Sequence, residues 1–228
     1  MTWIVRTFFV LLGFTLAVKA DLDKQPVSKL VILSGSPIAY GYMTRMKQNI
    51  INSCKENGHN IENDLEKTYD DLVNCVNKTT LYVEKKKEYL KNLDDCSKLP
   101  IQKAKHCLTK EQQYYPDVLL KIAKSQINFI CDHYETIKND LISCVKTYEK
   151  QDVRSQLSKC ISDINGSVKD TSPIPSSFSA FCQKYSPSHR CFSDILNKEC
   201  KQYPKLKQFG DDYNLAMSFP CTQKSFNM

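Results

Sequence analysis

The chain has 228 residues, a formal net charge of +7 and 11 cysteines. The basic excess is small and lysines are interspersed with acids, as in Glu84-Lys85-Lys86-Lys87-Glu88. Such runs are typical of the solvated face of a helix, so the charge predicts no nucleic-acid partner. The closest cysteines are nine residues apart and no C-x-x-C occurs, which excludes a zinc knuckle or a thioredoxin-like site.

Residues 1–20 are predicted to form a secretory signal peptide. Arg6 precedes an uncharged stretch, and Val18-Lys19-Ala20 places small residues where a signal peptidase reads them. The apolar run is about a dozen residues, short of the roughly 20 that a transmembrane helix needs. We therefore expect a secreted, extracellular protein without a transmembrane segment. Residues 21–36 have no cysteine and weak patterning, and the sequence leaves open whether they are ordered.

From residue 37 onward, apolar residues recur at intervals of three and four, which indicates amphipathic helices. We predict an all-α fold, a disulfide-stapled helical bundle built from helix hairpins, in a single cysteine-rich domain over residues 37–228. The proline-bearing loop at 171–176 could instead separate two helical lobes. Turn signals such as Asn57-Gly58, Leu99-Pro100 and Ser186-Pro187 place the helix ends. The expected helices are 38–56, 60–95, 101–111, 117–149, 152–164, 177–184, 187–201 and 204–218.

The cysteines are expected to form a disulfide framework of five bridges with one thiol left over, because unpaired thiols are the exception in an oxidising compartment. A helix rises about 1.5 Å per residue and a disulfide needs Cα atoms within about 7 Å. One helix therefore cannot join Cys191 to Cys200, or Cys131 to Cys144. The candidates are Cys54, Cys75, Cys96, Cys107, Cys131, Cys144, Cys160, Cys182, Cys191, Cys200 and Cys221.

Some cysteines straddle a predicted turn at matched heights. We expect three hairpin staples: Cys96 with Cys107, Cys144 with Cys160, and Cys182 with Cys191. The pair Cys54–Cys75 is excluded, because these residues lie at different distances from the Asn57-Gly58 turn. Five cysteines then remain for two long-range bridges and one spare thiol, which could link two chains into a dimer: Cys54, Cys75, Cys131, Cys200 and Cys221.

Two N-glycosylation sequons agree with secretion. They begin at Asn77 (Asn-Lys-Thr) and at Asn165 (Asn-Gly-Ser), and both asparagines would have to face solvent to accept a glycan.

No motif predicts catalysis, a metal or a cofactor. The four histidines lack metal-binding spacing, and there is no G-x-S-x-G, G-x-G-x-x-G or P-loop. Cys131-Asp132-His133-Tyr134 resembles the helix of secreted phospholipases, but residues 108–130 hold no glycine for a calcium loop. His133 is therefore interpreted as a polar-face residue, and we predict that the chain is not an enzyme. The histidines are His59, His106, His133 and His189.

Tyrosines occur near several predicted helix ends, namely Tyr40, Tyr42, Tyr114 and Tyr115. Such positions can line a pocket, but we interpret these residues as half-buried packing residues with a wet hydroxyl.

The order of the cysteines resembles the insect 27 kDa haemolymph glycoprotein family. The resemblance opens on the run from Cys54 to Gly58 (CKENG) and on Asp71-Leu72-Val73-Asn74-Cys75. It continues through residues 128–131 (NFIC) to Pro220-Cys221, and so covers nearly the whole mature chain. One further cysteine, usual in the family soon after the position of Cys107, is missing here, which would explain the odd count. The resemblance implies a secreted helical glycoprotein of body fluid with no established activity.

Two kinds of function fit these observations. One is a secreted binding protein that takes a small apolar ligand or a protein partner; the C-x3-C of insect odorant-binding proteins is missing. The alternative is a salivary or venom effector that acts through its surface on a host or immune target.

Overall fold

The computed structural model describes residues 37–144, 155–156, 159–160, 163 and 174–222. These residues form helices and connecting turns without a strand, which confirms the predicted all-α fold. The predicted signal peptide, the segment 21–36, the Asn165 sequon and most of the expected helix 152–164 lie outside the described residues. Among the residues that the structure does describe, no helix is both long enough and apolar enough to cross a bilayer.

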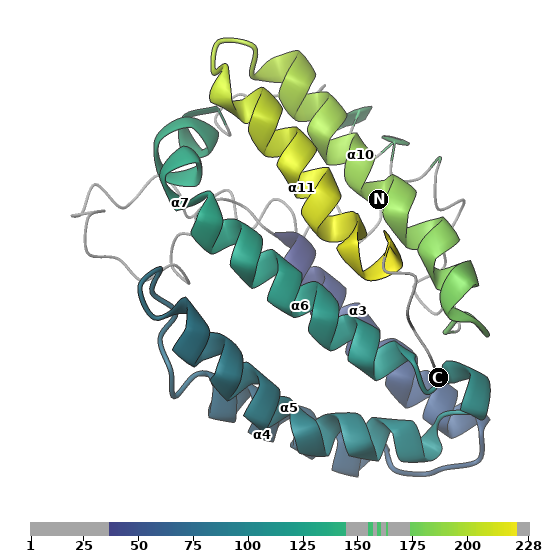
Figure 1. Ribbon diagram of the computed structural model, residues 1–228. Helices are drawn as coiled ribbons and strands as arrows, with labels where there is room; N and C mark the ends of the chain where they lie inside the picture. Colours follow the sequence, from purple (N-terminus) through teal and green to yellow (C-terminus); the bar gives the residue numbers. More distant parts are fainter. Residues whose placement is uncertain (1–36, 145–154, 157–158, 161–162, 164–173, 223–228) are drawn as a thin grey trace.

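The described residues include six long helices, which pack as a bundle with α6 running through its middle (Figure 1). The α5 helix packs on one side of α6 and α11 on the other, while α10 lies beside α11. The α3 helix contacts α4, α5 and α6. The long helices are α3 (Pro37–Glu56), α4 (Glu62–Val76), α5 (Lys86–Cys107), α6 (Tyr115–Asp132), α10 (Phe178–Glu199) and α11 (Lys205–Thr222). Shorter helical segments are η3 (Lys110–Gln112), α7 (Tyr134–Thr136) and the π-helical η4 (Ile137–Leu141).

The α3 helix ends at the predicted Asn57-Gly58 turn. Gly58 has a φ of +83°, a conformation that glycine adopts without steric cost. The His59 amide donates to the Cys54 carbonyl at 2.9 Å, as in a Schellman C-cap. The Asn57 side chain donates to the Cys107 carbonyl at 2.9 Å, so the ends of α3 and α5 are held together beside the Cys54–Cys107 disulfide.

The expected helix 60–95 is wrong, because the chain leaves the helix between α4 and α5. Residues 77–85 include the β-branched Thr79, Thr80 and Val83, which form helices less readily. Leu81 in this connection is buried and packs in one cluster with Cys131 of α6. The burial of Leu81 against a third helix is a tertiary effect that local periodicity does not reveal.

Two predicted helix ends at prolines are also wrong. Pro100 lies inside α5, and Pro187 lies inside α10, so a single helix of 22 residues runs through each expected break. A proline in a helix interior removes one backbone hydrogen bond and costs about 3 kcal/mol. Apolar side chains are buried on both sides of each proline, among them Leu93 and Ala104 in α5. We attribute the continuity of both helices to this packing.

Five disulfides staple the described helices. All three expected hairpin staples are wrong, and the exclusions of Cys191–Cys200, Cys131–Cys144 and Cys54–Cys75 are confirmed. The bridges are Cys54–Cys107, Cys75–Cys96, Cys144–Cys200, Cys160–Cys191 and Cys182–Cys221.

The errors have a physical cause in the uninterrupted helices. Eleven residues of continuous helix separate Cys96 from Cys107 by about 16 Å, and nine separate Cys182 from Cys191 by about 13 Å. Cys144 pairs instead with Cys200 at the C-cap of α10, and Cys160 pairs with Cys191 inside α10, each over a Cα distance of 5.8 Å. The docking of α10 therefore decides this part of the pairing.

The buried residues form two main clusters. One joins α10 and α11 to the carboxyl-terminal end of α6, with Leu196, Leu206 and Met217 almost completely buried. The other joins α3, α4 and the start of α6, with Val118 at its centre. Because α6 and α10 contribute residues to both clusters, the two cores are connected through these helices.

Candidate ligand-binding cavity

An apolar cavity of about 120 Å³ lies among α3, α4, α5 and α6. Aliphatic side chains, two prolines and one tyrosine make up most of its wall. The apolar and aromatic lining residues are Ile50, Ile51, Leu65, Tyr69, Leu72, Leu93, Pro100, Ile101, Ala104, Pro116, Leu119, Leu120 and Ala123. The polar lining residues are Lys47, Thr68 and Ser97.

Helical spacing brings these side chains to one place. Leu65, Tyr69 and Leu72 recur at intervals of four and three on α4, and therefore lie on one face of that helix. On α5 the same spacing places Leu93, Ser97, Pro100 and residues beyond it on the facing surface. The structure shows that this face of α4 borders a cavity that the neighbouring side chains do not fill.

The small side chain of Ala104 on α5 is buried and lines the cavity. A longer aliphatic side chain at this position would occupy part of the space. Pro100, one turn earlier on α5, also lines the cavity. These two residues are the only sequence signals that could have indicated a gap, and neither is specific enough to predict one.

Lys47 is the only charged residue among the described residues that line the cavity. Its Nζ lies 4.9 Å from the centroid of the Tyr69 ring, a cation–π arrangement. It also lies 3.6 Å from Oε1 of Glu66, longer than the 2.7–2.9 Å or so of a charge-assisted hydrogen bond. The ammonium is thus held beside an aromatic wall by a loose ion pair.

The Thr68 hydroxyl is fully engaged within the protein. It donates to the Asp64 carbonyl at 2.6 Å and accepts a hydrogen bond from Lys103 Nζ at 3.1 Å. Lys103 in turn donates to both carboxylate oxygens of Asp64. This network joins α4 to α5 and orients Thr68 without requiring a ligand.

The size of the cavity limits what it can hold. An enclosed apolar cavity of about 150 Å³ admits benzene, whereas sites for drug-sized molecules measure about 300 Å³ or more. The cavity among α3, α4, α5 and α6 is therefore suited to a ligand about the size of one small ring. No histidine, cysteine or acid is among its described lining residues, so no nucleophile–base pair faces a ligand there.

The histidines predicted to be scattered remain apart from one another and from the cavity. His59 and His106 are exposed. His133 is not a polar-face residue as expected: its ring packs 4.5 Å from that of Phe129, and its Nε2 lies 3.6 Å from Asp212 of α11. The end of α6 is covered by α11, which half-buries this histidine. In the part of the chain that the structure describes, no three potential metal ligands lie together.

His189 on α10 is the most buried of the four histidines, with 5% of its surface exposed. It packs against Tyr185 and Tyr213, and burial lowers its pKa to about 4. It does not line the cavity among α3, α4, α5 and α6, and we assign it a place in the core.

Cys131 is the unpaired cysteine among the described residues and is buried. Desolvation by burial raises the pKa of its thiol to about 11, with smaller effects from nearby charges. Because the thiolate is the reactive form, this thiol is a poor nucleophile at neutral pH. A dimer linked through Cys131 stays a prediction, and it would require the thiol to become exposed first.

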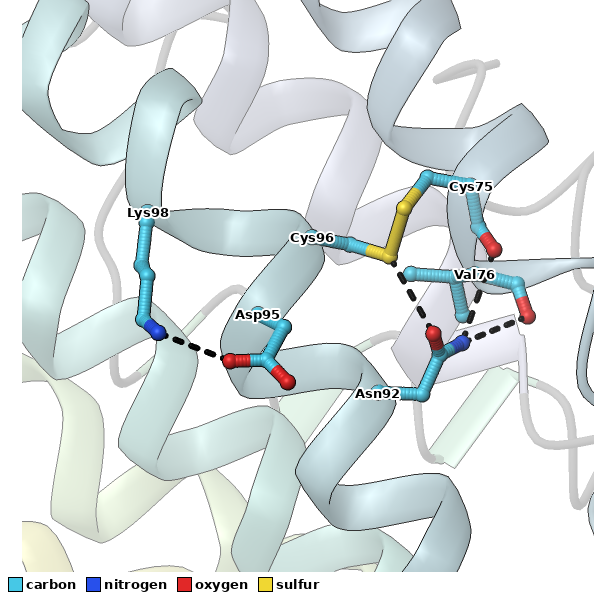
Figure 2. The surroundings of a disulfide bond; sticks show 6 residues. All are labelled: Cys75, Val76, Asn92, Asp95, Cys96 and Lys98. Carbon is cyan, nitrogen blue, oxygen red and sulfur yellow. Dashed lines mark hydrogen bonds and ion pairs between the residues drawn. A yellow bond between two sulfur atoms is a disulfide. The ribbon is translucent and has the colours of Figure 1, made fainter.

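The Cys75–Cys96 disulfide lies near the first sequon and joins α4 to α5 (Figure 2). Asn92 points toward the end of α4, where its Nδ2 lies 3.5 Å from the Cys75 carbonyl oxygen and 3.4 Å from that of Val76. Asn77, the C-cap of α4, is exposed. The position of this asparagine is therefore compatible with the glycan that the sequon predicts.

Tyr114 and Tyr115 act in packing, as predicted, but they are almost completely buried instead of half-buried with a wet hydroxyl. Tyr114 is buried, donates to the Pro175 carbonyl at 2.8 Å, and meets Tyr115 edge to face. Desolvation raises the pKa of Tyr115 to about 12. The side chains of Tyr40 and Tyr42 lie outside the described part of the structure.

Comparisons with known proteins add no relative. No family model, no curated protein and no solved structure matches this chain. The fold and the cavity therefore carry the functional conclusion.

Proposed function

We propose that this chain is a secreted, disulfide-stapled helical protein that binds one small, largely apolar ligand in the cavity among α3, α4, α5 and α6. The observation that carries the proposal is the cavity itself, an apolar space of about 120 Å³ bounded by four helices. Its wall is predominantly apolar, with a few polar groups that could orient a ligand. The proposal assigns no reaction to the site.

Secretion is supported by five disulfides and by the signal peptide that the sequence predicts. The cysteine order that resembles the insect 27 kDa haemolymph glycoproteins supports an insect body fluid or a glandular secretion as the setting. Exposed Asn77 supports glycosylation. Digestion of the native protein with an N-glycosidase should shift its mass, and Asn77→Gln should remove the part of the shift due to this site.

Native mass spectrometry of protein purified from its own tissue tests the binding function. A carrier should retain a small molecule that is released on denaturation. Ala104→Leu, which extends an aliphatic side chain into the cavity, should reduce that occupancy. Ala104→Ser is the matched control, because it changes the same position with little added volume. Equal occupancy in the wild type and in Ala104→Leu would contradict the assignment to this cavity.

A second function, action through the surface on a protein target, is favoured by a pair of apolar side chains on α11. Leu215 is 70% exposed and Phe219 is 47% exposed, and their spacing of four places them on one face of the helix. A double variant, Leu215→Glu with Phe219→Glu, should then lose a stoichiometric partner that copurifies with the wild type. Retention of the partner by this variant would exclude this face.

A further inference from the structure

We infer that the ligand of the cavity is a small organic acid, with an apolar body of about one ring and a carboxylate that meets Lys47. This inference rests on the proposed function and specifies the chemical class of the ligand. It is argued from the position, the contacts and the charge of Lys47.

The described residues that line the cavity carry charge of one sign only. Lys47 supplies a positive charge, while none of the described lining residues supplies a negative one. The carboxylate of Asp64 is held by Lys103 at 2.7 and 2.9 Å and lies outside the lining. An anionic group inside the cavity would therefore meet an opposite charge without meeting a like charge from the wall.

The ammonium of Lys47 has capacity for another partner. It carries three donors, and its contact with Glu66 Oε1, at 3.6 Å, is too long for a strong hydrogen bond. The Glu66 side chain is 49% exposed, whereas that of Lys47 is 21% exposed. Water can solvate Glu66 if it separates from the lysine, so a ligand carboxylate can replace it at small cost.

The aromatic wall next to Lys47 fits the rest of such a ligand. The Tyr69 ring, 4.9 Å from the ammonium, lines the cavity together with Leu65 and Leu72 of the same helix. A ring or short branched chain could pack against this face while its acid group reaches Lys47. The volume of about 120 Å³ excludes the full length of a long-chain fatty acid.

Three probes distinguish the contribution of a ligand charge from that of apolar contacts. They are toluene, phenylacetate and the neutral phenylacetamide. They would be titrated into the full-length oxidised protein at neutral pH, with the methyl NMR signals of Ile51, Leu65 and Leu119 as the readout. We expect phenylacetate to bind about tenfold or more tightly than phenylacetamide, the value of one hydrogen bond to a charged group. Lys47→Met should abolish that preference while leaving toluene binding intact.

Lys55→Met is the matched control on the same helix. Lys55 also makes a loose ion pair, 4.0 Å from Glu62, but is 74% exposed and does not line the cavity. The Lys55→Met variant should keep the preference for phenylacetate, and the Lys47→Arg variant should keep part of that preference. Persistence of the full preference in Lys47→Met would overturn the role of Lys47.

The remaining outcomes separate the two proposals. Binding of toluene with no preference for phenylacetate over phenylacetamide would overturn the acid class and leave the apolar cavity site standing. Absence of any shift at the three methyl groups with all probes would overturn the proposed function itself. Ala123→Leu provides a second filling variant, should Ala104→Leu fail to fold, and it should weaken all three probes alike.

Discussion

Nδ1 of His189 lies 3.4 Å from the hydroxyl oxygen of Tyr213, so the α10–α11 contact contains a buried imidazole held beside a buried phenol. Nε2 of the same ring is buried without a hydrogen-bond partner. The nearby Ser193 hydroxyl donates to the Gly210 carbonyl at 2.7 Å. The two helices therefore approach closely around polar groups, and protonation of His189 would place a charge between them.

The stability of the fold should fall in mild acid because of His189. Burial lowers the folded-state pKa from 6.5 to about 4, so between these values the unfolded chain binds a proton that the folded chain does not. Stability is therefore undiminished above pH 6.5 and is lost progressively as the pH falls toward 4. A shift of this size corresponds to about 3 kcal/mol.

Urea unfolding between pH 4 and 8 measures this effect. His189→Phe should flatten the slope between pH 4 and 6.5, whereas His106→Gln, at an exposed position, should leave it unchanged. An unaltered slope in His189→Phe would show that other groups cause the acid sensitivity.

The thiol of Cys131 should be inert in the native protein. With 4% of its surface exposed and its pKa raised to about 11 by burial, it should react with iodoacetamide at pH 8 far more slowly than a free cysteine does. Denaturation should release one rapidly reacting thiol per chain. Rapid labelling of Cys131 without denaturant would show that the Leu81 connection opens readily, and would favour the predicted disulfide-linked dimer.

The five disulfides should differ in their rate of reduction. Both cysteines of Cys182–Cys221 are only partly buried, whereas both cysteines of Cys54–Cys107 are almost completely buried. Attack on a disulfide requires access of the reductant to a sulfur, so a mild reductant without denaturant should open Cys182–Cys221 first. Differential alkylation with peptide mapping gives the order, and simultaneous loss of all five bridges would indicate that reduction follows global unfolding.

Asn92→Ala should destabilise the α4–α5 hairpin by about 1 kcal/mol, the usual net value of a side-chain hydrogen bond. Its amide lies within 3.5 Å of two carbonyl oxygens in the last turn of α4, where helical partners are lacking. Thermal unfolding measures the loss. Asn139→Ala is a suitable control, because the Asn139 side chain bonds only an exposed glutamate four residues away among the contacts described. An equal effect of the two substitutions would argue against a role of Asn92 in capping α4.

The sequence by itself determined the helical class, the division of the cysteines into five disulfide pairs and one free thiol, and the turn at Gly58. These features depend on local periodicity, on parity and on the conformational freedom of one residue, all of which are visible along the chain. The rise per residue of a helix also sufficed to exclude Cys191–Cys200 as a pair.

Only the tertiary structure decided the pairing itself. Packing keeps α5 and α10 continuous through Pro100 and Pro187, which separates Cys96 from Cys107 and directs each to another helix. The cavity beside Lys47 likewise depends on how four helices meet and on which side chains fall short of filling the space between them. Local sequence periodicity identifies the face of a helix that is buried, but the partner of that face, and any gap left beside it, are fixed by contacts between residues far apart in the chain.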